Sequence, residues 1–296
     1  MGFGQGAMSE TAGHEFRHLS PATASLGRVF ARPRVLAGLC VIVLAGLGWV
    51  YLALLSAAGT TGSLGWFGFV QVLCSTLQDG FAGPYAAAVI FSMWCAMTLA
   101  MMLPSAAPMI LTYTEIADTA ARKSERIVSP FALAAGYAVV WFGFSVFAAL
   151  GQVGLTRATL LDRSMASASP LLSGAIFVFA GIYQFSALKH ACLTQCRHPF
   201  PVFFTNWATT PTGVFKLGLK QGLYCVGCCW AMMLLMFAVG LMNIVWMAGI
   251  GTAMTLEKML TGRRFTHAIG VVLIAVGAVI VLTTLTGGWS PRTGLK

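Results

Sequence analysis

The stretch QGLYCVGCCWAMMLLMFAVGLMNIVWMAGIGTAMTL, from Gln221 to Leu256, decides the fold of this chain. Its 36 residues include no Asp, Glu, Lys or Arg. A single helix of that length would extend about 54 Å, nearly twice the hydrocarbon thickness of a bilayer. A break near Gly240 would divide the stretch into a tight hairpin of two membrane spans, and one long tilted span is the alternative.

The composition of the whole chain points to the same class. Of the 296 residues, 58% are hydrophobic and 9% are charged, and the mean hydropathy is +0.82. Soluble proteins are about 25% charged, so a secreted disulfide scaffold, a disordered protein and an ordinary cytosolic enzyme are all excluded. The net charge of +10 comes from scattered basic residues without a basic stripe or an RNA-binding motif, which excludes a nucleic-acid partner.

Uncharged segments long enough to cross a bilayer recur along the chain. Besides the two in the hairpin, we expect spans at Val35–Ser56, within Gly80–Thr114, from Phe131 to just before Arg157, between Arg163 and Lys189, and at His267–Thr286. The fold class is therefore an all-α, polytopic transmembrane helix bundle of about seven spans, or six if the hairpin is one span.

The basic residues predict the orientation of the bundle. With seven spans and a cytoplasmic N-terminus, fourteen of the 18 Lys and Arg fall on the cytoplasmic side, as the positive-inside rule requires. We expect a basic cytoplasmic tail at 1–34, one transmembrane domain at 35–287 and a C-terminal tail at 288–296. The segment 57–79 suits an external interface, and Pro199–Phe215 is expected to form an interfacial or re-entrant loop because its prolines prevent a spanning helix. A multi-pass protein of a bacterial inner membrane, in contact with the lipid bilayer, is predicted.

Five of the eight cysteines fall in two clusters, which makes them the candidate metal-binding or redox residues. The first cluster, KHACLTQCRHP, places Cys192 and Cys196 one helical turn apart, with His190 and His198 beside them. The second, GLYCVGCCWAMM, places Cys225, Cys228, Cys229, Met232 and Met236 within about 100° of a helical wheel. Thiolates, imidazoles and thioethers are ligands for Cu(I) or zinc. Lone cysteines such as Cys40 and Cys74 are instead expected to pack as small hydrophobes.

Two further predicted spans carry candidate metal-binding residues near the same side of the membrane. The second contains a stripe of methionines that includes Met101, followed by Pro104 and Pro108, which would kink the helix and open backbone carbonyls. The sixth places Asn243, Met247, Met254 and Glu257 on one face. Glu257 is either a surface salt-bridge partner of Lys258 or Arg197, or a ligand or proton acceptor. The candidate metal ligands are Cys192, Cys196, Cys225, Cys228, Cys229, His190, His198, Met101, Met232 and Glu257.

Three blocks carry a family resemblance: WCAMTLAMMLPSAAPM (Trp94–Met109), YQFSALKHACLTQCRHP (Tyr183–Pro199) and GLYCVGCCWAMMLLMFAVGLMNIVWM (Gly222–Met247). Together with Glu257 and Lys258, they resemble a bacterial family of predicted metal-binding integral membrane proteins, some of which are described as copper chaperones. The resemblance covers about residues 85–260 and implies metal binding. The chain departs from the expected pattern at Gln195, where a His is expected.

The leading hypothesis is binding and delivery of Cu(I) through the Cys, Met and His cluster, with zinc or iron as alternative metals. A soluble metal carrier or a metal-requiring protein would be the partner. Two other functions stay open. A membrane metallo-oxidoreductase could use the imidazoles with Glu115 and Glu257, and a thiol–disulfide oxidoreductase could use the Cys225-x-x-Cys228 spacing. The sequence identifies no catalytic residue.

Overall fold

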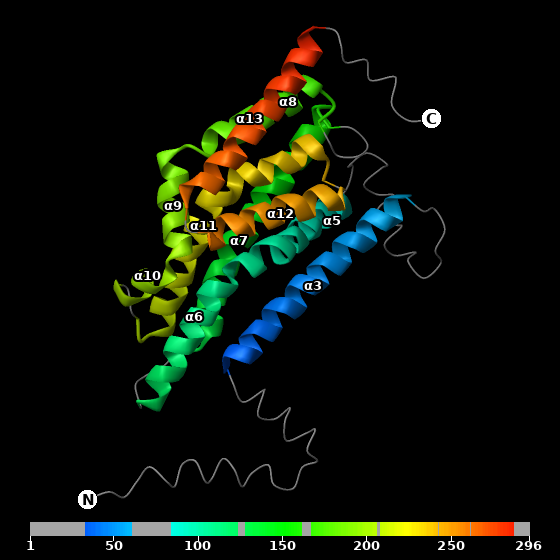
Figure 1. The fold of residues 1–296 in the computed structure, drawn as a ribbon. Helices are drawn as coiled ribbons and strands as arrows, with labels where there is room; N and C mark the ends of the chain where they lie inside the picture. The colour runs from blue at the N-terminus through cyan, green and yellow to red at the C-terminus, as the bar shows by residue number, and fades with distance from the viewer. Residues whose placement is uncertain are drawn as a thin grey trace, which may run out of the picture.

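The chain forms a bundle of α-helices (Figure 1). The computed structural model describes residues 33–60, 84–123, 128–161, 167–205, 208–241, 243–260 and 262–286. Across these ranges the only β pairing is an isolated bridge between Leu161 and Ser167. The elements are α3 (Pro33–Thr60), α5 (Pro84–Met97), the π-helix η2 (Thr98–Met102), α6 (Leu103–Arg122), α7 (Pro130–Arg157), α8 (Pro170–Tyr183), α9 (Ala187–Arg197), α10 (Pro199–Thr205), α11 (Pro211–Val239), α12 (Ile244–Met259) and α13 (Arg263–Leu285).

Proline marks the beginning of several helices rather than interrupting them. In α7, α8 and α11 the N-cap residues are Ser129, Ser169 and Thr210, and proline follows each of them. The cap side chain accepts a hydrogen bond from a backbone N–H of the first turn. Proline is tolerated there because the N–H groups of the first turn have no partner within the helix, so the absence of one costs nothing. The expected loop at Pro199–Phe215 is therefore largely helical, with α10 and then the first turn of α11.

The break near Gly240 divides the long uncharged stretch as predicted. Gly240 ends α11 with φ of 97°, a conformation that disfavours residues with a Cβ. Asn243 then begins α12, because its side-chain oxygen accepts the N–H groups of Val245 and Trp246. The prediction that Asn243 lies on the inner face of a span with Met247 is wrong, since Asn243 is an exposed helix cap.

Within the described part of the chain, five helices are long and apolar enough to cross a membrane, and a sixth span results if α8 and α9, bent by 65°, form one broken span. The longest is continuous from Ala87 to Ala121 through α5, η2 and α6. The remaining predicted span corresponds to α12, whose 16 residues extend only about 24 Å. The expected tails and the segment 57–79 lie almost entirely outside the described residues.

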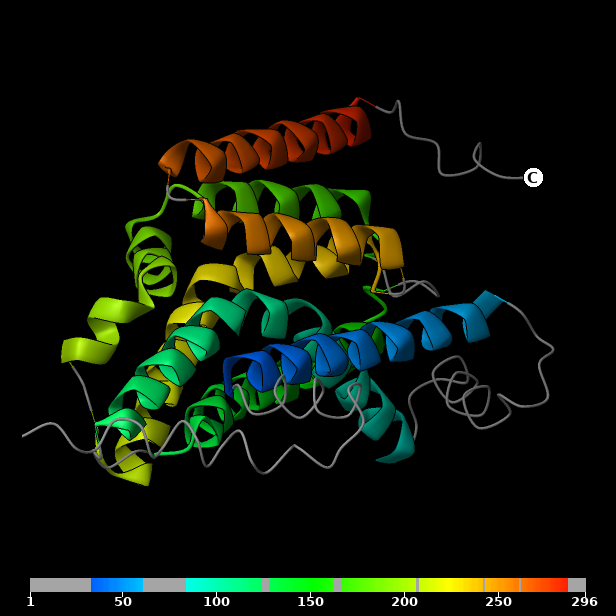
Figure 2. The ribbon, with the colours of Figure 1, turned by 60° about the horizontal axis from the view of Figure 1, so that its bottom comes forward.

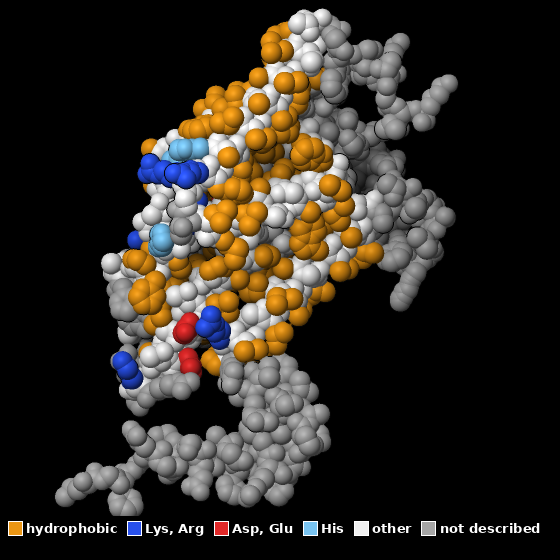
Figure 3. All heavy atoms as spheres, viewed as in Figure 1, with side chains coloured by type: hydrophobic (Ala, Val, Ile, Leu, Met, Phe, Trp, Pro, Cys, Tyr) orange, Lys and Arg blue, Asp and Glu red, His pale blue; other side chains and the backbone are white. Residues whose placement is uncertain are grey.

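Helix α11 lies at the centre of the bundle and packs against α7, α8, α9 and α12 (Figure 1). About half of its apolar window is buried (56%), against 22% in α3 and 17% in α13. Figure 2 shows α3 and α13 at opposite outer sides of the bundle, with α11 and α12 between them. Apolar side chains cover much of the outer face in Figure 3, as a lipid-facing surface requires.

Contacts place the basic ends of the helices at one end of the bundle. Arg34 at the start of α3 lies 3.3 Å from Glu115 in α6, and Tyr113 in the same helix donates to the carbonyl of Val128 just before α7. The start of α7 packs against the start of α11. Arg197 in α9 reaches the carbonyl of Gly262 before α13. We call this the basic end.

Candidate metal centre

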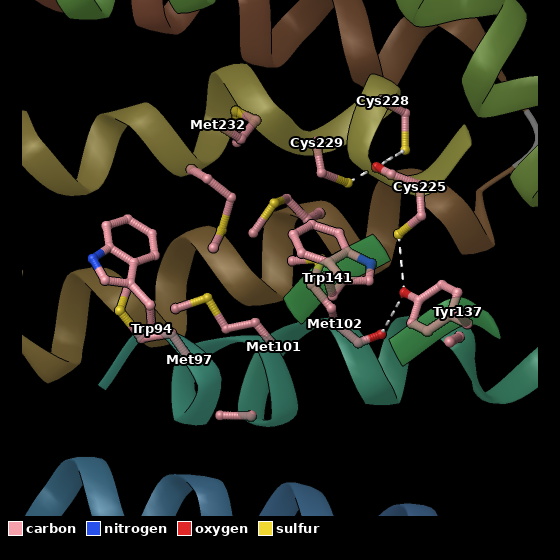
Figure 4. Close-up of a cluster of buried hydrophobic side chains, with 14 of the residues drawn as sticks. Trp94, Met97, Met101, Met102, Tyr137, Trp141, Cys225, Cys228, Cys229 and Met232 are labelled. Atoms are coloured by element: carbon pink, nitrogen blue, oxygen red, sulfur yellow. Dashed lines mark hydrogen bonds between the residues drawn. The ribbon is translucent and has the colours of Figure 1, made fainter. Parts of the chain in front are cut away.

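Helix α11 brings three buried cysteines to the basic end of the core. Cys225, Cys228 and Cys229 are 1–2% exposed. Their spacing of three and four residues places them on one face, because 3.6 residues make one turn. Figure 4 shows their sulfur atoms among buried Met and aromatic side chains. All three are free thiols.

A fourth cysteine joins them from α9. The Sγ of Cys228 lies 3.3 Å from that of Cys229 and 3.9 Å from that of Cys196. The bend between α8 and α9 turns α9 toward α11, so that two segments separated by more than thirty residues supply one group of thiols. Cys196, Cys225, Cys228 and Cys229 are called the thiol cluster below.

A buried cation lies against the thiol cluster. The ammonium of Lys258 in α12 lies 3.0 Å from the Sγ of Cys225 and donates to the hydroxyl of Ser105 at 2.7 Å. The hydroxyl of Tyr137 also lies 3.0 Å from the same sulfur (Figure 4). A positive charge at this distance stabilises a thiolate. Lys258 is 9% exposed, so little water screens the interaction.

Glu257 is the partner of a different lysine. Its Oε2 accepts from Lys189 in α9 at 2.8 Å, and the two side chains are 1% and 0% exposed. The predicted surface salt bridge with Lys258 or Arg197 is therefore wrong: Arg197 donates instead to the backbone carbonyl of Glu257. The carboxylate neutralises a buried ammonium, which leaves it less able to act as a metal ligand.

Methionines surround the thiol cluster on the side of the bundle core. Met101 lies on η2 and packs against Gly251 of α12, where a Cβ would meet its Cγ at 3.1 Å. The thioether of Met232 accepts a hydrogen bond from Gln184, the interior partner that this amide requires. Ten of the methionines that the structure describes are buried: Met93, Met97, Met101, Met102, Met109, Met232, Met233, Met236, Met247 and Met254.

The π-helix η2 precedes Pro104 in the second span. Proline cannot donate to the carbonyl of Ala100, four residues earlier, and the indole N–H of Trp49 in α3 donates to it instead. The carbonyl of Met102 accepts from Ser105 and Tyr137. Pro104 thus frees the carbonyl of Ala100 as predicted, but the indole of Trp49 satisfies it.

Three further predicted ligands are not part of the thiol cluster. Cys192 packs against Gly227, where a Cβ would come within 2.6 Å of its Sγ, so it borders the cluster. His190 faces α13, and its Nε2 lies 3.3 Å from that of His267. His198 is an exposed residue at the C-terminus of α9. Glu115, offered for a harder site, pairs with Arg34 at the surface.

No set of three or more His, Cys, Asp and Glu side chains among the described residues is arranged to hold a metal ion. The donor chemistry nevertheless suits a soft metal. Two sulfurs bound to one tetrahedral ion at about 2.3 Å lie roughly 3.8 Å apart. The Sγ atoms of Cys196 and Cys228 are close to this separation, at 3.9 Å. Those of Cys228 and Cys229, at 3.3 Å, are about 0.5 Å closer together.

Sequence reasoning missed Lys258, Tyr137 and Ser105 as neighbours of the thiols. Lys258 carried a signal, because it stands one residue from Glu257 at the end of an apolar helix and cannot be buried without an anionic partner. Tyr137 and Ser105 carried none, because only the packing of α6 and α7 against α11 shows which face they occupy.

The fold and the site define a class of protein: an apolar multi-helix bundle with buried thiols and thioethers between its helices. The chain belongs to the family whose model is described as PpoB2, copper chaperone, which matches residues 91–280. That range includes the thiol cluster, Lys258 and the surrounding methionines. No curated protein and no solved structure matches the chain.

Proposed function

We propose that this protein binds Cu(I) at the thiol cluster and delivers it to a copper-requiring partner. The observation that carries the proposal is the meeting of Cys196 from α9 with Cys228 and Cys229 from α11 in the core. Copper handling agrees with the family description. The Sγ atoms of Cys228 and Cys229 are closer together than two ligands of one tetrahedral ion, so binding requires small movements of the thiols around a common centre.

The buried ammonium of Lys258 suits a Cu(I) ion bound by two thiolates. Two thiolates and one Cu(I) carry a net charge of −1, which the ammonium of Lys258 balances. Zn(II) bound by all four thiolates would carry −2, and Lys258 would leave one uncompensated negative charge in an apolar core, which is unfavourable. Among the described carboxylates, the buried Glu257 already balances Lys189.

The methionines support transfer rather than permanent storage. Thioethers are weak, uncharged ligands, and passage of an ion requires sites that release it. Met101 on η2 and Met232 on α11 lie in the core beside the cysteines (Figure 4). We place the cluster on the cytoplasmic side of a bacterial inner membrane, in line with the basic end, where a soluble carrier would meet the protein.

The test is a Cu(I) competition titration of the detergent-purified, reduced full-length protein against a chromophoric chelator. We expect one equivalent of Cu(I) bound through sulfur in the parent, and loss of that sulfur-bound ion in the variant with Cys225, Cys228 and Cys229 changed to Ser. Lys258→Met is expected to weaken binding at least about tenfold, which corresponds to 1.4 kcal/mol, because the thiolate loses its counter-charge. Lys216→Met, at an exposed position of the same helix α11, is the matched control.

Two results would contradict the proposal. One is Cu(I) binding by the triple Ser variant with the affinity of the parent. The other is stoichiometric zinc in the protein as purified, with Cu(I) unable to replace it.

A further inference from the structure

A second group of metal-binding side chains lies outside the thiol cluster. His190 in α9 and His267 in α13 face one another with their Nε2 atoms 3.3 Å apart. Both side chains are half-buried, so they are reachable from the surface. Figure 3 shows histidine side chains beside a group of basic side chains on the outer face of the bundle.

Two elements hold the pair in place. The turn after α8 ends at Ser186, which caps α9 by accepting the N–H of Lys189 and so directs His190 toward α13. The ring of Phe185 stacks on His267 with a centroid distance of 5.1 Å and an interplanar angle of 27°. Phe185 in turn lies against Gly270, where a Cβ would meet the ring at 2.7 Å. The orientation of His267 is therefore set by packing.

The separation of the two nitrogens is that of a long N–H···N hydrogen bond, and it also fits shared coordination of one ion. N–H···O hydrogen bonds in proteins are usually about 2.9–3.0 Å long. Two imidazole nitrogens bound to one tetrahedral ion at about 2.0–2.1 Å lie roughly 3.3–3.4 Å apart. The observed 3.3 Å already matches this separation, so an ion requires reorientation of the two rings but no approach of His190 to His267.

The charges around the pair select the ion. Arg263, Lys189 and Arg197 all act electrostatically on His190. A divalent ion is repelled twice as strongly as a univalent ion at the same place. Imidazole is a good ligand for copper, so Cu(I) fits both the ligands and the charge.

We propose that His190 and His267 form a second metal site, which binds Cu(I) with two positions left open for ligands from a partner. A tetrahedral ion held by two imidazoles has two further positions, and on the half-exposed side these can be filled by water or by the thiolates of a carrier protein. The choice of Cu(I) as the metal rests on the proposed function. The geometry of His190 and His267 is independent of the proposed function.

The experiment uses the full-length protein with the four cysteines of the thiol cluster changed to Ser, titrated with Cu(I) alone. We expect one equivalent bound, with nitrogen and no sulfur in the first coordination shell by X-ray absorption. Adding His190→Ala or His267→Ala should weaken binding at least tenfold. Lys216→Met, at an exposed position of α11, should leave it unchanged.

A second measurement keeps the thiols, in case the Ser variant does not fold. In the parent with ¹⁵N-labelled histidine, Ag(I) added beyond the amount that the thiols bind should shift the Nε2 resonances that disappear in His190→Ala and His267→Ala. The proposal is overturned if Cu(I) does not bind to the folded Ser variant, if binding survives loss of both imidazoles, or if Zn(II) binds there as tightly as Cu(I). Loss of copper from the triple Ser variant, without a nitrogen-bound ion, would leave the proposed function standing and remove only this site.

Discussion

Lys189 and Glu257 show what a single pair of residues contributes inside the bundle. Both are almost fully buried, and the Oε1 of Glu257 has no hydrogen-bond partner among the described residues. A buried ion pair gains little over an apolar pair of the same volume, but loss of one partner leaves an uncompensated charge. The pair therefore fixes how α9 lies against α12 more than it adds to stability.

Glu257→Gln or Lys189→Met alone is expected to lower the free energy of unfolding by about 3–5 kcal/mol. The double variant should lose less than the sum of the two, with a coupling of about 1–3 kcal/mol. Thermal or denaturant unfolding in detergent, followed by circular dichroism, measures both quantities.

The surface pair Arg34–Glu115 provides the control for that cycle. Its atoms are 3.3 Å apart, but both side chains are 61% exposed. Glu115→Gln should therefore cost less than about 1 kcal/mol. If the losses in the free energy of unfolding caused by Lys189→Met and Glu257→Gln were additive in the double variant, the contact between Lys189 and Glu257 would not matter to the fold.

At the scale of elements, glycines decide how closely α7 and α11 approach. A Cβ on Gly218 of α11 would overlap the carbonyl oxygen of Leu133, and a Cβ on Gly136 of α7 would overlap that of Phe215. The backbones are thus in direct contact, as small residues permit between membrane helices. This contact brings Tyr137, one residue after Gly136, to the sulfur of Cys225.

Gly218→Ala should therefore destabilise the protein by about 1–3 kcal/mol or more, the usual cost of overpacking, and weaken Cu(I) binding through displacement of α7. Gly143→Ala, in α7 with nothing within 4 Å of the added Cβ, should change neither. Unfolding and Cu(I) titration of the two variants together test this, and equal behaviour of both would show that the contact is not required.

Several elements could be predicted from the sequence, because their signals are local. Composition predicts the helical bundle, and the length of the uncharged stretch predicts the break at Gly240. The bend of 65° between α8 and α9 could not be predicted, since it depends on how Ser186 caps a new helix and on packing against α11 and α13.

The same distinction holds for the candidate site. Cys225, Cys228 and Cys229 share a face by helical periodicity alone, and the sequence placed them correctly. The separation of His190 from the thiols could not be seen, because it depends on which neighbour each face of α9 meets. The roles of Cys192, His198 and Met101 as ligands stay predictions.

At the scale of the whole molecule, the basic end and the thiol cluster lie together. Of the described Lys and Arg, Arg157 at the end of α7 belongs to the opposite end of the bundle. From the positive-inside rule we expect the thiols on the cytoplasmic side, where they would stay reduced.

Reporter fusions after residues 123 and 160 test this orientation. Alkaline phosphatase, which is active only outside the cytoplasm, should be active after Leu160 and inactive after Lys123. Green fluorescent protein should show the reverse pattern at the same two positions. If both patterns are inverted, the thiols face the oxidising side and thiol–disulfide exchange becomes the function to test.

Helix α9 fixes the distance between the two proposed copper sites, because it carries His190 of one site and Cys196 of the other. Six residues of α-helix correspond to a rise of about 9 Å and a rotation of about 240°. Arg197, bonded to the carbonyls of Glu257 and Gly262, fastens the end of the helix. One ion cannot touch both sites at once, so a copper ion moving between them has to hop, and the rate of delivery would be set by its departure from the first ligands.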